Sequence, residues 1–279
     1  SASLNNIFQQ ISSNIQTGGA GTTLGSETVV KDIISPYFTL PAGASAGSIR
    51  LNTYACTGKN GDEYTWSSNS SGNGGATATV NGDRVSVTGF NFSENWCGTE
   101  TDANGQTTVR GKKLVISFEV KPKDGFLGGN GVPTNTSAGI YENANADNPV
   151  KEFPIPTVNV PIQPVTASAE DKNVYLLGNV TEDQLKDGAE VKCGNVPLKL
   201  NEANYGLEEW QTKFVEITTT VTPKGSTNLT DDTPYTISVT VGPKPDSTPA
   251  EVGTEAVAKT DTANQKINVF KPELTFKDT

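Results

Sequence analysis

The chain has 279 residues, enough for about two domains, and carries a formal charge of −10 with no His and no Met. The acidic balance excludes a general phosphate-binding surface, so we expect no nucleic-acid partner. The lack of His excludes Ser-His-Asp, Cys-His and His-zinc chemistry within this sequence. With 28 Gly and 16 Pro, the composition favours a β-rich binding or structural module over an enzyme.

The first segment predicts an amphipathic helix over residues 4–16. Its apolar residues recur at helical spacing and are Leu4, Ile7, Phe8, Ile11 and Ile15. Ser3 is placed to cap the helix, and the glycines at 18–19 are placed to end it. Such an apolar stripe needs a partner, and we expect the helix to belong to a domain that precedes this chain.

The sequence after this segment predicts short strands. Four runs alternate between apolar and polar residues, and they are 84–88, 113–120, 214–217 and 236–241. Glycine-containing turn signals at 81–83 and 104–105 separate neighbouring strands. We therefore expect an all-β fold of tandem immunoglobulin-like sandwiches with a short N-terminal helix.

The composition changes once, at 153–164, where four prolines interrupt a strand pattern. We expect a terminal helix and linker over 1–22, a first sandwich over 23–163 and a second over 164–279. The sequence around Asn268 echoes that around Asn159, and their spacing of 109 residues matches one immunoglobulin-like domain. This short repeat favours tandem domains on a stalk.

Three cysteines occur in the chain. Cys56 and Cys97 lie in the first expected domain, and a disulfide between them would close a loop of about 41 residues and stabilise the fold by roughly 4 kcal/mol. The alternative is a pair of buried reduced thiols. Cys193 then has no partner, and we expect it to pack in the core.

Three aromatic residues are candidates for a ligand platform. Trp66, Trp96 and Tyr64 could stack on a sugar, although a Trp packed between two sheets is the more frequent arrangement in sandwiches. Glu63 and Glu94 show no spacing that identifies a glycosidase pair, because such pairs are assembled in space. A secreted hydrolase would need converging carboxylates with raised pKa values in a cleft.

No metal or cofactor is expected. The oxygen-rich segments 102–105 and 228–232 could begin a calcium loop, but both lack the later Glu of an EF-hand, so we interpret them as turns. Five Asn-X-Ser/Thr sequons occur, at Asn69, Asn91, Asn135, Asn179 and Asn228. In a chain this rich in Asn and Thr, chance explains most of them.

Segments 89–96, 111–120 and 267–276 resemble large sortase-anchored surface proteins of Gram-positive bacteria. In that family, a von Willebrand factor A-type domain is followed by immunoglobulin-like or Cna-type sandwiches. Segments 4–11 and 28–38 are similar to the last helix of the A-type domain and the first strand of the next module. The metal-binding serine motif of an A-type domain is absent, so the resemblance transfers no adhesion site of that kind.

The resemblance also implies intramolecular isopeptide bonds. In these, a buried neutral Lys amine attacks an Asn amide with help from a buried acid. Lys31, Asn159 and Glu119 are in suitable places in the first domain. In the second domain the corresponding residues are Lys172, Asn268 and Glu216. The alternative is that the lysines are solvated, the asparagines only occupy terminal strands and the acids are exposed.

These features together predict a non-enzymatic stalk or spacer in a bacterial cell-surface adhesin. The alternative is a module that binds a carbohydrate or host protein itself, which would expose Trp66, Trp96 or Tyr64. We expect flanking domains of the same longer chain as partners, a monomer, and an extracellular location with cell-wall anchoring through a missing C-terminal region. No stretch of the sequence is apolar enough to span a membrane.

Overall fold

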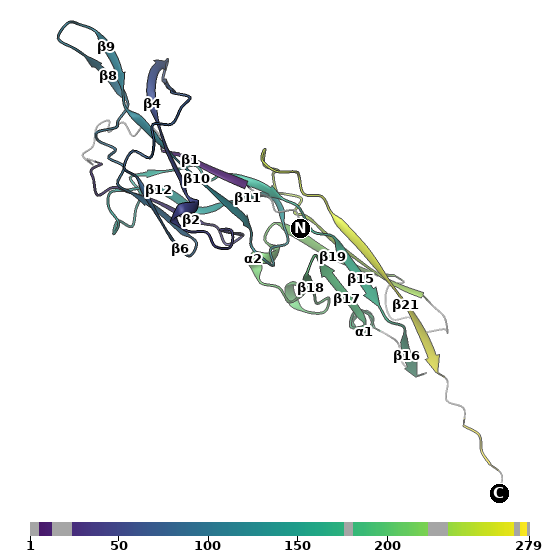
Figure 1. The fold of residues 1–279 in the computed structure, drawn as a ribbon. Helices are drawn as coiled ribbons and strands as arrows, with labels where there is room; N and C mark the ends of the chain where they lie inside the picture. Colours follow the sequence, from purple (N-terminus) through teal and green to yellow (C-terminus); the bar gives the residue numbers. More distant parts are fainter. Residues whose placement is uncertain (1–5, 13–23, 176–180, 223–233, 271–273, 278–279) are drawn as a thin grey trace. The chain divides into compact units, whose positions relative to one another are not determined.

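The computed structural model describes residues 6–12, 24–175, 181–222, 234–270 and 274–277 (Figure 1). The chain forms two units. Unit 1 comprises Ser1–Lys123 and Pro133–Thr157, and unit 2 comprises Asp124–Val132 and Val158–Thr279. The chain therefore passes between units three times, and the boundary expected near residue 164 lies inside unit 2.

Both units consist mostly of strands, which confirms the all-β class. In unit 1, one sheet has the order β1-β10-β4-β5, and β3 also pairs with β10. These strands are β1 (Asn6–Ser12), β3 (Phe38–Thr39), β4 (Arg50–Asn60), β5 (Glu63–Trp66) and β10 (Lys112–Pro122). The predicted run 113–120 is therefore the centre of this sheet.

The second sheet of unit 1 has the order β13-β12-β2-β7-β6. Its strands are β2 (Val29–Ile34), β6 (Thr77–Asn81), β7 (Arg84–Thr88), β12 (Asn135–Tyr141) and β13 (Lys151–Glu152). Gly82 joins β6 to β7 with φ +60, a conformation that favours glycine in a tight turn. A 3-10 turn, η1 (Ala46–Ser48), and a separate hairpin of β8 (Gly98–Thr101) and β9 (Thr107–Arg110) complete this unit.

The helix predicted over 4–16 is wrong. Residues 6–12 form the edge strand β1, which pairs antiparallel with β10 from Asn6 opposite Val120 to Ser12 opposite Leu114. An unpaired edge of β10 would expose main-chain N–H and C=O groups, and pairing with β1 satisfies them. Tertiary pairing therefore overrides the local helical spacing, and the helix gives no support for a preceding A-type domain.

The central strand β10 is buried on both faces. The pattern predicted Leu114, Ile116 and Phe118 as its core side, and all three are buried. Val115 and Ser117, on the other face, are buried as well. An alternating pattern identifies the more apolar face of a strand, but it does not reveal that the second face is also covered.

Unit 2 contains two sheets. One has the order β15-β17-β18 and the other β16-β21-β20-β19. Their strands are β15 (Val165–Ala169), β16 (Lys172–Tyr175), β17 (Ala189–Cys193), β18 (Val196–Leu198), β19 (Val215–Thr222), β20 (Pro234–Pro243) and β21 (Lys259–Phe270). On β20, every second residue from Tyr235 to Val241 is buried in the core, as the run 236–241 predicted.

The consecutive strands β15 and β16 belong to different sheets of unit 2. β15 pairs antiparallel with β17, whereas β16 pairs parallel with β21. The chain changes sheet at Glu170 and Asp171, and both residues bind β21 there. Gln265 Nε2 donates to the Glu170 carbonyl at 2.9 Å, and the Lys266 N–H donates to Asp171 Oδ1 at 3.0 Å. These bonds hold the two sheets together at one edge.

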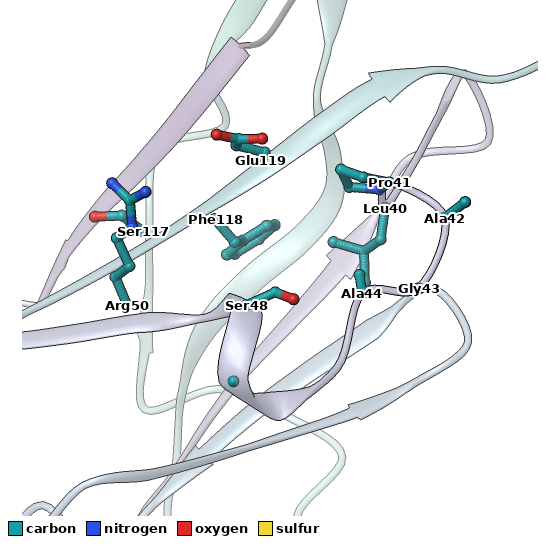
Figure 2. A pocket seen from close by; sticks show the side chains of 11 residues that line it. Leu40, Pro41, Ala42, Gly43, Ala44, Ser48, Arg50, Ser117, Phe118 and Glu119 are labelled. Atoms are coloured by element: carbon teal, nitrogen blue, oxygen red, sulfur yellow. The ribbon is translucent and has the colours of Figure 1, made fainter.

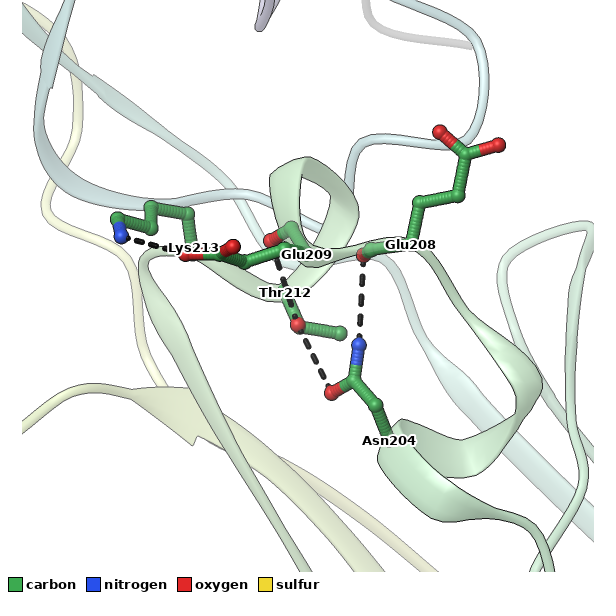
Figure 3. A network of polar contacts seen from close by, with 5 residues as sticks. All are labelled: Asn204, Glu208, Glu209, Thr212 and Lys213. Atoms are coloured by element: carbon green, nitrogen blue, oxygen red, sulfur yellow. Dashed lines mark hydrogen bonds and ion pairs between the residues drawn. The ribbon is translucent and has the colours of Figure 1, made fainter.

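In the described part of unit 2, three short helical segments connect the strands, namely α1 (Glu182–Lys186), η2 (Ala203–Gly206) and α2 (Glu209–Thr212). Asn204 has φ +47 and organises the junction of η2 and α2 (Figure 3). Its amide donates to the Leu207 carbonyl at 2.8 Å and accepts from the Thr212 hydroxyl at 3.0 Å. The Lys213–Glu209 ion pair at 2.8 Å closes the same turn.

Two short strands, β11 (Gly129–Pro133) and β14 (Thr157–Val160), pair where the chain passes between the units. Within unit 2, β11 supplies Asn130, whose side chain is buried. It accepts from the Ala256 N–H at 2.7 Å and donates to the Ala256 carbonyl at 3.4 Å. The segment 124–132 is therefore fixed to the long connection between β20 and β21.

Candidate functional site

An aromatic and cationic surface lies on one face of β10, β4 and β5 in unit 1. Lys113 is directly opposite Tyr54 in the β10–β4 pair, and its Nζ lies 5.6 Å from the centre of that ring. The same Nζ lies 5.0 Å from the centre of the Trp66 ring. The Trp66 and Tyr64 rings are 6.3 Å apart, and Lys59 Nζ lies 5.3 Å above Tyr64. We call these five residues the aromatic ladder.

Trp96 forms a second aromatic site near the β8–β9 hairpin. Its side chain is 45% exposed, and the Arg110 guanidinium lies 5.0 Å from the ring centre. Arg110 also forms an ion pair with Glu100 and donates to the Glu94 carbonyl at 3.2 Å. A Cβ at Gly98 would collide with the Trp96 ring, so the glycine provides the flat surface on which the ring lies.

Two buried thiols lie next to the aromatic ladder. Cys56 is opposite Trp66 in the β4–β5 pair, and the Tyr64 hydroxyl donates to the Cys97 carbonyl at 3.4 Å. Both cysteines are buried and free in the structure. Burial, followed by the charge and hydrogen bond of the neighbouring Cys56, raises the pKa of Cys97 to about 12. The disulfide between them stays a prediction, and their proximity supports it.

Cys193 in unit 2 is a buried free thiol on β17, in the core of that unit. Its Sγ lies 3.5 Å from the Gln163 carbonyl. Burial raises its pKa to about 11, although the bond to Gln163 acts in the opposite direction. A thiol with so little thiolate at neutral pH is a poor nucleophile, which fits a packing role.

A pocket of about 290 Å³ opens beside β10 in unit 1 (Figure 2). The 40–48 loop forms one wall, and Phe118 lies at the centre, with Arg50 and Glu119 at the margin. The pocket occupies a gap in the sheet, because β4 pairs with β10 up to Ser117 and β3 resumes the pairing at Lys121. Glu119 is the one carboxylate among the described residues that line it, and these residues do not supply the acid pair of a glycosidase.

The structure assigns the isopeptide residues of the first domain to different units. Lys31 on β2 belongs to unit 1, where its Nζ donates to the Ala146 carbonyl at 2.9 Å and lies 4.4 Å from the Tyr141 ring centre. Glu119 is in unit 1 and lines the pocket. Asn159 on β14 is in unit 2, which resumes at Val158. The three side chains thus have separate surroundings.

Asn159 is 1% exposed and binds main-chain groups from two segments of unit 2. Its Nδ2 donates to the carbonyls of Ala250 and Gly253 at 2.9 and 3.1 Å. Its Oδ1 accepts from the N–H groups of Gly131 and Ala250 at 3.1 and 2.7 Å. The whole amide is therefore used to hold the 250–253 connection and β11 against β14.

The isopeptide residues of the second domain all lie in unit 2. Lys172 Nζ donates to the Gln184 carbonyl, and Asn268 Nδ2 donates to Asn173 Oδ1 at 3.1 Å. Lys172 and Asn268 are on the paired strands β16 and β21. Glu216 is exposed on β19, which is separated from β21 by β20. The acid is thus two strands away from the strand that carries Asn268.

A buried carboxyl that the sequence analysis missed lies on β2. Asp32 is 2% exposed, accepts a hydrogen bond from Asn135 Nδ2, and has no partner for its Oδ2. Thr134 Oγ1 donates to Asn135 Oδ1 at 2.6 Å. Burial raises the pKa of Asp32 to about 7, and the Asn135 bond partly offsets this. A charged residue inside the apolar run 29–34 was the signal that could have identified it.

The turn interpretation holds for the segment 102–105. Asp102 Oδ1 accepts from the N–H groups of Asn104 and Gln106 at 2.9 and 2.8 Å, so the carboxylate closes the β8–β9 turn. The segment 228–232 and the sequons at Asn179 and Asn228 lie outside the described residues. Within the described ranges, no cluster of acidic, Cys or His side chains could hold a metal ion.

The other sequons and carboxylates differ in exposure. Asn69 is exposed and Asn91 half-buried, whereas Asn135 is buried and so cannot accept a glycan in the folded state. Glu63 and Glu94 are exposed. No helix within the described residues is long and apolar enough to cross a membrane.

No protein-family model and no curated protein matches this sequence. Among solved structures, the similarity to the RrgA Jo.In complex extends over 53% of this chain and 76% of the chain in that complex, with 14% identity and a TM-score of 0.30. The pilus adhesin RrgA from Streptococcus pneumoniae covers 90% at 11% identity and a TM-score of 0.30. The pilus adhesin SpaC from Lactobacillus rhamnosus GG covers 89% at 10% identity and a TM-score of 0.29. The chain spans 33% and 43% of the length of these two adhesins.

Proposed function

We propose that this chain is part of a bacterial cell-surface adhesin, acts outside the cell without an enzymatic step, and uses unit 2 as a load-bearing stalk. The observation that carries the stalk role is the parallel pairing of β16 and β21, from Lys172 opposite Ile267 to Tyr175 opposite Phe270. The chain enters β16 and leaves β21 at opposite ends of this pair. A pulling force along the chain therefore loads its hydrogen bonds together, in shear.

Force spectroscopy on the full chain tests the stalk role. We expect unit 2 to unfold at a higher force when the chain is pulled by its ends than when handles are attached at residues 215 and 243. Val215 and Pro243 are opposite each other at one end of the β19–β20 pair, so pulling there opens one bond at a time. Equal forces in the two geometries would contradict the stalk role.

A second function, as a binding module in its own right, is favoured by the exposure of Trp96 and by the aromatic ladder. A spacer has no need for an exposed Trp, and exposed aromatic surfaces often mark interaction sites. A host protein or a glycan is the proposed partner. Screening the full chain on glycan and matrix-protein arrays, with Trp66→Ala beside the wild type, tests this function. Loss of a bound ligand in the variant would support it, and identical profiles would contradict it.

A further inference from the structure

The side chains of the aromatic ladder lie on one face because of the strand register. Lys113 and Tyr54 are opposite each other, and Cys56, two residues after Tyr54, is opposite Trp66. Tyr64 precedes Trp66 by two residues and therefore points to the same side. Three rings and two ammonium groups thus follow one another across β10, β4 and β5 in the order Tyr54, Lys113, Trp66, Tyr64 and Lys59.

The two lysines keep an uncompensated positive charge in a chain of net charge −10. Neither Lys59 nor Lys113 takes part in the ion pairs found among the described residues. The faces of aromatic rings attract the ammonium groups only weakly, by about 0.5–1 kcal/mol at exposed sites. Lys113 is partly buried, and this desolvation lowers its pKa. Because Lys113 has already lost part of its hydration, binding an anion there would cost less desolvation free energy than at a fully exposed lysine.

We propose that the aromatic ladder binds an acidic glycan, a chain of pyranose rings that carry carboxylate or sulfate groups. This inference rests on the second proposed function and names its ligand class. The rings of Trp66, Tyr64 and Tyr54 match the flat C–H faces of pyranoses. The ammonium groups, Lys113 between two rings and Lys59 at the end of the ladder, match the anionic substituents. A neutral glycan would leave the lysines without a counter-charge, so the local positive charge favours an acidic one.

Residues next to the ladder hold it in place. Cys56 is opposite Trp66, and the Tyr64 hydroxyl donates to the Cys97 carbonyl at 3.4 Å. Gly111, with φ +107, lets the main chain of Trp96 and Cys97 approach β10 so closely that a Cβ would collide with it. The platform is thus preorganised, which lowers the entropic cost of binding.

Binding of the full chain to chondroitin sulfate, to hyaluronate and to neutral dextran, measured by calorimetry at low and high salt, tests the proposal. We expect binding to at least one acidic polymer, no binding to dextran, and weaker binding at high salt. Lys113→Gln and Lys59→Gln should each weaken binding about tenfold, the equivalent of one charge-assisted contact. Lys112→Gln is the matched control, because Lys112 precedes Lys113 on the same strand and points to the opposite face.

The outcomes separate the ligand class from the binding function itself. Equal losses in the Lys112 and Lys113 variants would indicate non-specific charge attraction and overturn the proposal. Binding of dextran or of a protein that depends on Trp66 but not on Lys113 would overturn the acidic class while it supports a binding module. No binding to either acidic polymer would overturn the acidic-glycan proposal, and the array screen would still test the binding function.

Discussion

Asp32 in unit 1 and Asn159 in unit 2 are both buried polar side chains on strands, but their surroundings differ. Asn159 makes four hydrogen bonds to main-chain groups and leaves no amide atom unused. Asp32 binds Asn135 with one carboxyl oxygen and leaves the other without a partner. A satisfied amide stabilises its unit at every pH, whereas an incompletely satisfied carboxyl makes stability depend on its protonation.

The largest effect is expected for Asn159→Ala. The substitution removes the buried Asn159 amide and with it the four hydrogen bonds to main-chain groups of Gly131, Ala250 and Gly253, at about 1 kcal/mol each because those groups are only partly buried. We expect unit 2 to lose about 4 kcal/mol of unfolding free energy, measured by urea titration. Asn268→Ala is the control, since Asn268 is half-buried with one bond to Asn173. Equal losses in both variants would contradict the anchoring role of Asn159.

Oxidation of the Cys56–Cys97 pair to a disulfide should change the stability of unit 1 by a similar amount, but in the opposite direction. Glutathione disulfide would accept the two electrons, and the two thiol protons would be taken up by the two glutathione thiols that form. We expect stabilisation by roughly 4 kcal/mol and one remaining titratable thiol, that of Cys193. In a Cys193→Ser variant the oxidised protein should contain no free thiol. Three free thiols after oxidation of the wild type and denaturation would contradict the pairing.

The pH dependence of unit 1 tests the state of Asp32. Burial raises the pKa of Asp32 from the ordinary 3.8 to about 7, so between these values the folded state holds a proton that the unfolded chain has lost. The protonated Asp32 carboxyl therefore contributes to the unfolding free energy of unit 1 in full below pH 4. This contribution falls as the pH rises towards 7, by at most about 4 kcal/mol in total. Asp32→Asn should be more stable than the wild type at pH 8 and lose this advantage at pH 4.

The control for Asp32 is Asp83→Asn, which changes an exposed aspartate in the neighbouring β6–β7 turn. We expect its difference from the wild type to stay constant between pH 4 and pH 8 in urea titrations. If the Asp32 and Asp83 variants gave the same pH profile, Asp32 would not be the titrating group.

The smallest effect is expected at Asn204, where φ is +47. Asn204→Ala places a Cβ-bearing residue without polar atoms in a left-handed conformation and should cost about 1–2 kcal/mol. Asn204→Gly removes the same hydrogen bonds but tolerates the backbone angle, so it should cost about half as much. Thermal melting of the two variants measures the difference, and a costlier Gly variant would contradict this explanation.

The strands were more predictable than the contacts between them. Run 84–88 coincides with β7, and runs 113–120 and 236–241 lie inside β10 and β20, because alternation reflects one buried face directly. The segment 4–16 was misassigned because its apolar spacing also fits an edge strand, and only the neighbouring β10 decides between the two. Long-range pairing of this kind leaves no local signal.

The candidate site was predictable in part. Tyr64, Trp66 and Trp96 were identified as a possible platform from residue type alone. Their lysine partners were missed, because Lys113 meets Trp66 only through the pairing of β4 with both β10 and β5. Asn159 was chosen for its place on a terminal strand, and its role as an anchor depends on main-chain groups about 90 residues away.

Hydrogen exchange of the full chain, measured by mass spectrometry with and without the acidic polymer that binds, tests most directly whether the two units have different roles. Binding by the aromatic ladder predicts slower exchange in peptides covering 54–66 and 109–115, with unit 2 unchanged. Slower exchange confined to β15–β21 would contradict a supporting role for unit 2. No change at 54–66 despite binding would contradict a binding role for unit 1.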